Sequence, residues 1–276
     1  MFGINQIEET SSDISINWGE NLSEEYKSKK PYEIGDRYSY FYKKDVALYE
    51  VFEGSTIKVR PYLKADINLI AEFLLNFPMA LCLSQRNKIV LHASSVNINN
   101  TAVLFSGPSH SGKSTLAIAF SKSIATLLSE DISVLSFDEN NQLILQPSQP
   151  YIKLSKEAAT WAGLDFNGGL SFKNRERRGF QIKEFSEQIG LAKFCFFLNS
   201  SQNRLIIEHL SSREAIQNIY KYSYLSNTKK DNTKVLGLLK SLKFFSLGIP
   251  KNFGLLEQSC EDIVNFIKLE NNKFKG

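Results

Sequence analysis

The segment Leu104–Phe120, LFSGPSHSGKSTLAIAF, decides the fold class of this 276-residue chain. Within it, Gly107–Ser114 matches the pattern G-x-x-x-x-G-K-S/T of a phosphate-binding loop. The apolar residues before the loop predict a strand, and the proline-free residues after it predict a helix. Because the motif works only between a strand and a helix, the sequence predicts a loop that holds phosphate.

The residue types in this loop each have a physical reason to be there. Glycines at positions 107 and 112 let backbone N–H groups turn toward phosphate oxygens, and the following helix adds its positive end. Lys113 is expected to reach the β- and γ-phosphates, and the Ser114 hydroxyl to bind Mg²⁺. His110 lies at a variable position, where a bystander role is favoured. The candidate nucleotide-binding residues here are Gly107, Ser109, His110, Ser111, Gly112, Lys113, Ser114 and Thr115.

An acidic pair, Glu130 and Asp131, follows in the segment LLSEDISV. If residues 125–128 form the parallel strand that the chain reaches through the helix, their carboxyl end opens at the same edge as the loop. A carboxylate at that edge can take a proton from an acceptor hydroxyl during phosphoryl transfer. A solvated acidic turn is the alternative, and the topological position favours a catalytic role.

Two further groups of residues have open interpretations. His92 lies in the expected strand VLHASS, which pairs through Asn99–Asn100 with the strand entering the loop. From physics alone, a core histidine and a site histidine are equally supported. The stretch GGLSFKNRERRGF at 168–180 is predicted to be a loop, and its run RERRG at 175–179 is either a solvated basic face or a phosphate clamp. In the second case Arg178 would bind the nucleotide and Glu176 the metal.

Composition excludes several classes of protein. The 33 basic and 29 acidic residues give a net charge of +4, which is too slight to indicate nucleic acid binding. The three cysteines are scattered without metal-ligand spacing, so neither a disulfide framework nor a zinc site is predicted. No signal peptide is recognised, and we expect no apolar run of membrane-spanning length. The sequence therefore predicts a cytoplasmic protein without nucleic acid or membrane partners.

The chain is expected to contain two parts. Residues 1–85 are rich in aromatic and β-branched residues and predict a small β-rich module with a connecting helix that Asp66 caps. Residues 86–276 predict an α/β domain built around the phosphate loop. The fold class expected for the whole chain is α/β.

Taken together, VLHASSV, GPSHSGKS and LLSEDISVL resemble the catalytic domain of the HPr serine kinase/phosphorylase superfamily, over about residues 85–140. The resemblance implies that Lys113 and Ser114 bind nucleotide phosphates and Mg²⁺, and that His92 is an active-site histidine. It also implies that Glu130 and Asp131 are the family's acidic pair, which is usually Asp-Asp and whose first member is the acid/base. The stretch ERRG at 176–179 resembles the family's E-x-R-G, where the glutamate helps to hold metal.

The resemblance also bears on the acceptor. The segment FSLGIPKNFGLLEQ at 245–258 does not resemble the arginine-bearing loop with which bifunctional members engage HPr. The N-terminal residues look more like the leading part of related proteins encoded beside peptide natural-product clusters, including lasso peptide kinases. The function implied is an ATP- and Mg²⁺-dependent kinase of a serine hydroxyl, most simply on a small precursor peptide. Because members of that family form oligomers, the resemblance also implies that this chain forms a homo-oligomer.

Two other functions stay open. One is a kinase or nucleotidyltransferase of a small hydroxyl metabolite such as free serine. The other is a non-enzymatic adaptor in which ATP sets the conformation. Motor and transporter ATPases are disfavoured, because the chain has neither an LSGGQ-like signature nor an apolar strand that ends in their Asp-Glu pair.

Overall fold

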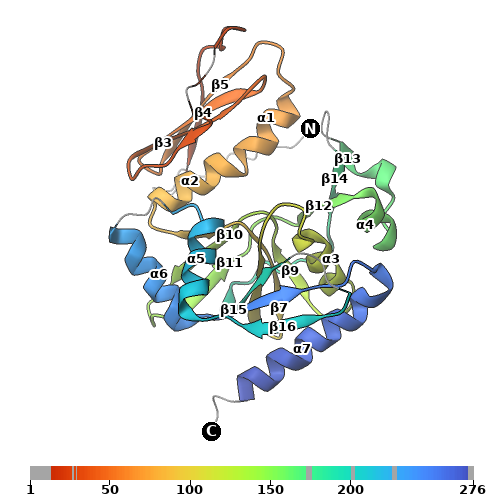
Figure 1. The fold of residues 1–276 in the computed structure, drawn as a ribbon. Coiled ribbons are helices and arrows are strands. Elements are labelled where there is room, and N and C mark those ends of the chain that lie inside the picture. The colour runs from red at the N-terminus through yellow and green to blue at the C-terminus, as the bar shows by residue number, and fades with distance from the viewer. Residues whose placement is uncertain are drawn as a thin grey trace. The chain divides into compact units, whose positions relative to one another are not determined.

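The computed structural model describes residues 14–26, 28, 30–171, 176–199, 203–225 and 229–272. The chain divides into two compact units, Met1–Asn87 and Lys88–Gly276, and each is described by itself. The protein is a mixed α/β protein with several sheets (Figure 1). All three cysteines are buried and free, as the sequence predicts.

The first unit is a five-stranded sheet with two helices on one face. Its strand order is β1-β5-β4-β3-β2, in which only β1 and β5 run parallel. The apolar face of β4 and β5 and the two helices share one core, because alternate residues of each strand point to the same face. The elements are β1 (Ser15–Trp18), β2 (Tyr32–Glu33), β3 (Tyr38–Lys43), β4 (Ala47–Phe52), β5 (Thr56–Pro61), α1 (Ile67–Leu74) and α2 (Phe77–Gln85).

The connecting helix is broken in two, which corrects the prediction of one continuous helix. Asp66 caps α1 as expected, since its side chain accepts a hydrogen bond from the Asn68 N–H at 2.9 Å. The break falls at Leu75 and Asn76, just before Pro78 in the first turn of α2. Proline has no N–H to bond to the carbonyl of Leu74, four residues earlier, and its ring clashes with that carbonyl, so one helix ends and a new one starts.

The stretch Ile67–Gln85 also corrects the expectation about apolar runs. By length and composition alone it is apolar enough to cross a membrane, with a mean hydropathy of 1.6. Of its most apolar window, 28% is buried. Here Ile70, Leu74 and Leu81 are buried with residues of β4 and β5 in the core of the first unit.

The second unit is built on a nine-stranded sheet. The strand order is β6-β10-β11-β15-β8-β7-β9, and β17 joins β15 to the edge strand β16. The strands are β6 (Ile89–Leu91), β7 (Ala93–Ile98), β8 (Thr101–Ser106), β9 (Thr126–Ser129), β10 (Ser133–Phe137), β11 (Leu143–Gln146), β15 (Gly190–Leu198), β16 (Ile206–His209) and β17 (Lys243–Gly248).

Helices cover both faces of this sheet (Figure 1). On one face α3 (Lys113–Ser123) and α7 (Leu256–Asn272) pack on side chains such as Phe105 and Phe196. On the other face α5 (Ser212–Tyr222) and α6 (Lys229–Ser241) pack on side chains such as Leu104 and Phe197. Because neighbouring residues of β8 and β15 are buried on opposite faces, continuous apolar runs fill both strands at 102–105 and 194–198.

The topology gathers three chain segments at one edge of the sheet. β7 pairs antiparallel with both β8 and β9, so β8 and β9 run in the same direction with β7 between them. The carboxyl ends of β8 and β9 therefore lie beside the start of β7. The glycine-rich loop of residues 107–112 follows β8, the acidic pair follows β9, and His92 directly precedes β7.

A small three-stranded sheet, β12-β14-β13, completes the second unit. It consists of β12 (Tyr151–Ser155), β13 (Leu170–Ser171) and β14 (Arg177–Gln181), with α4 (Lys156–Trp161) and the short helix Phe166–Gly168 between them. The prediction of a loop for this region is therefore wrong where β13 and β14 form. Ile152, Leu154 and Phe180 anchor the small sheet in the core. Residues 172–175, and Arg175 with them, lie outside the described residues.

Candidate active site

The segment Gly107–Ser114 forms a turn between the carboxyl end of β8 and the start of α3. Gly107 has φ +147° and Gly112 has φ +98°, conformations that favour glycine. A Cβ atom at position 107 would lie 2.9 Å from the carbonyl oxygen of Leu198, and backbone cannot move aside cheaply. Both glycines are thus required by the shape of the turn.

Lys113 lies inside this turn. Its side chain is buried, and Nζ donates hydrogen bonds to the carbonyl oxygens of Gly107 at 3.0 Å and Pro108 at 2.9 Å. Burial lowers the pKa of Lys113, while the carboxylates of Asp131 and Glu130 act in the opposite direction. The ammonium group therefore sits in the concavity of the loop, bonded to two neutral carbonyl oxygens and, within the described residues, paired with no carboxylate.

The loop has an unsatisfied donor that a phosphate would satisfy. The Oγ atom of Ser111 is buried without a hydrogen-bond partner, and it lies 3.2 Å from where a Cβ of residue 107 would be. A buried hydroxyl without a partner is costly, and a phosphate oxygen is a strong acceptor. The residues therefore fit a phosphate group. Ser109 and His110 are exposed on the same turn, and Thr115 is half-buried at the start of α3.

Glu130 contacts the loop directly. Its Oε1 accepts a hydrogen bond from the Ser114 hydroxyl at 2.7 Å, and Arg177 donates to the same hydroxyl oxygen at 3.0 Å. Burial raises the pKa of Glu130 to about 8, and the neighbouring Asp131 carboxylate adds to the rise. Burial therefore favours the neutral form of Glu130 in the folded protein.

The donor set around Ser114 fits Mg²⁺ only together with substrate oxygens. Among the described residues, no group of three or more His, Cys, Asp or Glu side chains is arranged to hold a metal ion. Mg²⁺ in nucleotide sites commonly takes one or two protein oxygens and completes its shell with phosphate oxygens and water. The Ser114 hydroxyl is suited to be one of those oxygens.

Asp131 has different partners from Glu130. Its Oδ2 lies 2.5 Å from Nζ of Lys153, and the two side chains are only 20% and 13% exposed. Burial by itself would raise the pKa of Asp131, but Lys153, His92 and Arg177 outweigh burial and the pKa is lowered. Lys153 thus favours the charged form of Asp131, while burial favours the neutral form of Glu130, and such opposite environments can separate a base from an acid.

His92 lies at the junction of β6 and β7, where it faces the acidic pair. Its Nδ1 is 3.0 Å from the carbonyl oxygen of Asp131, and its own backbone N–H donates to the carbonyl of Tyr222 at 2.7 Å. Burial lowers the pKa of His92, and the charge of Lys113 lowers it further. Since a carbonyl only accepts, Nδ1 carries the proton and Nε2 remains an acceptor.

A chain of buried hydroxyls lies at the base of the acidic turn. Ser95 and Ser129 join through their Oγ atoms at 2.6 Å, and Ser129 and Ser133 through theirs at 2.7 Å. Ser133 then donates to the carbonyl of Ala93 at 3.1 Å. These bonds link β7, β9 and β10, so they fix the turn that carries Glu130 and Asp131. Nothing local in the sequence marked these serines.

The small sheet contributes two cations: Lys153, which no sequence motif marks, and Arg177 of the run RERRG, in which Arg178 is the residue predicted to bind the nucleotide. β12 and β14 pair antiparallel, with Lys153 opposite Gly179 and Ser155 opposite Arg177. Alternate residues of paired strands share a face, so Lys153 and Arg177 lie on the same face of this sheet. In YIKLS, Lys153 stands between two buried apolar residues, so the local pattern indicates that it points away from the core. The pattern does not identify its partner, because Asp131 follows a strand of another sheet.

The structure does not bring every candidate to this group. Arg178 donates to the carbonyl oxygens of Phe166 at 3.1 Å and Asn167 at 2.8 Å, and its guanidinium lies 4.9 Å from the Phe166 ring. Successive side chains of a strand point to opposite faces, so Arg178 turns away where Arg177 turns toward Ser114. Glu176 is exposed at the residue before β14.

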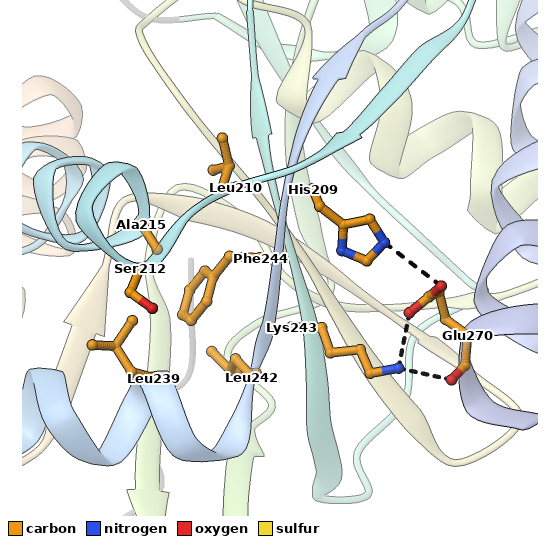
Figure 2. Close-up of a pocket in the computed structure, with 9 residues that line it drawn as sticks. All are labelled: His209, Leu210, Ser212, Ala215, Leu239, Leu242, Lys243, Phe244 and Glu270. Atoms are coloured by element: carbon orange, nitrogen blue, oxygen red, sulfur yellow. Dashed lines mark hydrogen bonds and ion pairs between the residues drawn. The ribbon is translucent and has the colours of Figure 1, made fainter. Parts of the chain in front are cut away.

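A separate cavity of about 400 Å³ lies elsewhere in the second unit (Figure 2). Leu239, Leu242 and Phe244 form part of its apolar wall, and Figure 2 shows Glu270 between His209 and Lys243 at one end. Nζ of Lys243 lies 2.9 Å from Oε2 and 2.7 Å from the backbone oxygen of Glu270. None of the predicted site residues lines this cavity.

The cavity and the loop of residues 107–112 lie at opposite ends of strand β17. Lys243 starts β17, whereas Ile249 follows its last residue. The Cδ1 atom of Ile249 lies 3.0 Å from where a Cβ of Gly112 would be, so the far end of β17 is the end beside the loop.

Comparison with known proteins adds a likeness of fold. No protein-family model matches the chain. No curated protein matches it either. Among solved structures it is similar to the HPr(Ser) kinase/phosphatase from Coxiella burnetii, with 15% sequence identity, 67% of this chain and 96% of that chain covered, and a TM-score of 0.35. With so low an identity and TM-score, function has to be argued from the chain's own residues.

Proposed function

We propose that this chain is an ATP- and Mg²⁺-dependent kinase that transfers the γ-phosphoryl group to a serine hydroxyl, with a short precursor peptide as acceptor. The observation that supports this most is the 2.7 Å hydrogen bond from Ser114 of the loop to Glu130 of the acidic pair. A loop that only held a nucleotide would not need a buried carboxylate pair at its serine, because burying carboxylates is costly.

The loop would hold the phosphates. Its backbone N–H groups, the unpaired Ser111 hydroxyl and the Lys113 ammonium are the donors, and Ser114 would hold Mg²⁺. When bound, Mg²⁺ neutralises charge on the phosphate oxygens. Positioning and electrostatics of this kind account for most of the catalysis in phosphoryl transfer.

Asp131 is our choice for the proton acceptor. Its Oδ2 lies 2.5 Å from the Lys153 ammonium, which favours the ionised form that can take a proton, whereas Glu130 is enclosed and hydrogen-bonded to Ser114. In the step, the O–H bond of the acceptor serine breaks and its proton moves to Asp131. The serine oxygen bonds to the γ-phosphorus as the bond to the departing ADP breaks. His92 holds the main chain of Asp131 through its carbonyl.

The test follows label from ATP to a panel of serine-containing peptides in the presence of Mg²⁺. We expect the wild type to transfer label from the γ-phosphate, and Lys113→Ala and Asp131→Asn each to reduce transfer on the order of 10²-fold or more. Lys240→Ala, at an exposed position of α6, is the control for loss of a lysine. Undiminished transfer by Lys113→Ala would contradict the proposal.

The position of the label in ATP and the molecule that receives it distinguish the alternative functions. Transfer from ATP labelled in the α-phosphate would instead indicate a nucleotidyltransferase. Label on free serine but on no peptide would place the acceptor among small metabolites. Tight ATP binding without transfer to any acceptor would favour a nucleotide-dependent adaptor.

A further inference from the structure

One cation of the site belongs neither to the phosphate loop nor to the acidic turn. Lys153 stands in the middle of β12, between Ile152 and Leu154, which are fully buried in the core. Alternation places Lys153 on the opposite face of the strand, where its Nζ lies 2.5 Å from Oδ2 of Asp131. The small sheet therefore delivers this charge to the acidic pair from outside the segment that carries the motif.

The energetics of a buried ion pair make a purely stabilising role a poor explanation. Desolvating an ammonium and a carboxylate costs about as much as their attraction returns, and apolar residues of similar size often serve as well. What the pair does give is a fixed geometry, because a short charge-assisted contact restricts the carboxylate far more than solvent does.

Asp131 is held from two directions. Its main chain has φ +61° and its carbonyl oxygen meets Nδ1 of His92 at 3.0 Å, while its side chain meets Lys153. Glu130, the adjacent carboxylate, is bound instead to Ser114. Each member of the acidic pair thus has its own partner, and the partner of Asp131 comes from β12 of the small sheet.

We propose that Lys153 is a positioning residue, which fixes the Asp131 carboxylate in the orientation from which it takes the proton of the acceptor hydroxyl. This inference rests on the proposed kinase function. Lys153 acts through Asp131, and it neither contacts the phosphates held by the loop nor takes up the proton itself. In the step it supports, the acceptor O–H bond breaks, the proton goes to a carboxylate oxygen of Asp131, and the acceptor oxygen bonds to phosphorus as ADP leaves.

A double-mutant cycle tests this role. Lys153→Met and Asp131→Asn are made singly and together, and phosphoryl transfer and ATP binding are measured for each. A misplaced base should lower kcat on the order of 10²-fold in Lys153→Met, with KM for ATP and ATP affinity unchanged. In the Asp131→Asn background, Lys153→Met should have no further effect, because the group through which it acts is gone.

The controls separate positioning from folding. Lys153→Arg keeps the charge and should recover part of the lost kcat, and it remains informative if Lys153→Met does not fold. Lys193→Met, at an exposed position of β15, is the matched control and should behave as wild type. Thermal unfolding of the same proteins without ATP should show that the two single changes are less than additive in the double variant.

The outcomes distinguish the two proposals. If the wild type transfers phosphate and the two changes multiply in kcat, the role of Lys153 is overturned while the kinase function stands. A loss of ATP affinity in Lys153→Met would overturn it as well, because Lys153 would then contact the nucleotide. If the wild type transfers phosphate to no acceptor, the proposed function fails and the reaction role of Lys153 with it.

Discussion

Glu130 and Asp131 are neighbours in the sequence, but they have opposite environments. Glu130 is fully enclosed beside the Ser114 hydroxyl, so burial dominates and favours its neutral form. The carboxylate of Asp131 contacts the Lys153 ammonium, and that cation favours its charged form. In one turn of chain, burial thus favours the neutral form of one carboxyl group and a cation favours the charged form of its neighbour. This division is the residue-scale basis of the proposed chemistry.

The raised pKa of Glu130 makes stability depend on pH in a defined window. The carboxyl keeps its proton when folded up to about pH 8, whereas the unfolded chain releases it near the ordinary value of 4.5. Between these values the unfolded state binds fewer protons, so the free energy of unfolding falls as pH rises. Glu130→Gln removes this loss, so the variant should gain stability over wild type as pH rises through that window.

Denaturant unfolding of both proteins across pH 4 to 9 measures the effect. Glu139→Gln, at an exposed turn position, is the control and should follow wild type. A stability difference between Glu130→Gln and wild type that does not change with pH would show that Glu130 ionises normally in the folded protein.

Gly107 provides a second prediction at this scale. Alanine there would need a left-handed φ of +147° and would place its Cβ 2.9 Å from a backbone carbonyl oxygen. Gly107→Ala should cost about 1–3 kcal/mol of strain and weaken ATP binding. Gly168→Ala, where the nearest atom is a side-chain oxygen at 3.4 Å, is the control. Calorimetric ATP affinity equal to wild type would refute the required shape of the turn.

At the scale of elements, the strand β14 sorts two consecutive arginines into different tasks. Arg177 donates to Ser114 of the loop, whereas Arg178 ties β14 to the carbonyl oxygens of Phe166 and Asn167. Arg177 therefore acts in the candidate site and Arg178 in the local fold. Their roles differ because successive side chains of a strand point to opposite faces.

Replacing each arginine by methionine tests the two roles separately. Each variant serves as the control for the other, because both lose one arginine from the same strand. Arg177→Met should weaken phosphoryl transfer or ATP affinity and change the melting temperature little. Arg178→Met should lower the melting temperature, because two hydrogen bonds to carbonyl oxygens are lost, and leave ATP affinity near that of wild type. The reverse pattern would mean that Arg178 faces the nucleotide in solution.

Some features of the fold and of the candidate site could be predicted from the sequence, and others could not. The strand, loop and helix around Gly107–Ser114 follow from local apolar pattern and glycine chemistry, so they were predictable. The break between α1 and α2 was also written locally, in Pro78, and the prediction overlooked it. Lys153 and Arg177 could not be placed, because their direction depends on the pairing of β12 with β14 and on contacts with another sheet. Such register is set by distant residues and not by the local pattern.

At the scale of the whole molecule, the two units have separate cores. The core of the first unit is built from residues between Val46 and Cys82, and both cores of the second unit begin at or after Ile89. All the residues of the candidate site belong to the second unit. The sequence placed the boundary near residue 85, and the division in the structure falls between Asn87 and Lys88.

Residues 88–276 expressed alone should therefore fold and bind ATP with the affinity of the full chain. Each unit has its own apolar core, and a unit with its own core can fold independently. Circular dichroism and calorimetry of the fragment and the full chain provide the comparison. A fragment that folds but binds ATP much more weakly would show that the first unit contributes to the nucleotide site.

The most direct test of the central claim is the intact mass of a serine peptide after incubation with the protein, ATP and Mg²⁺. The account predicts a gain of one phosphoryl group on the serine, absent with Lys113→Ala and absent when alanine replaces the serine of the peptide. A gain of a nucleotide, or an unchanged mass on every serine acceptor while ATP is bound tightly, would contradict it.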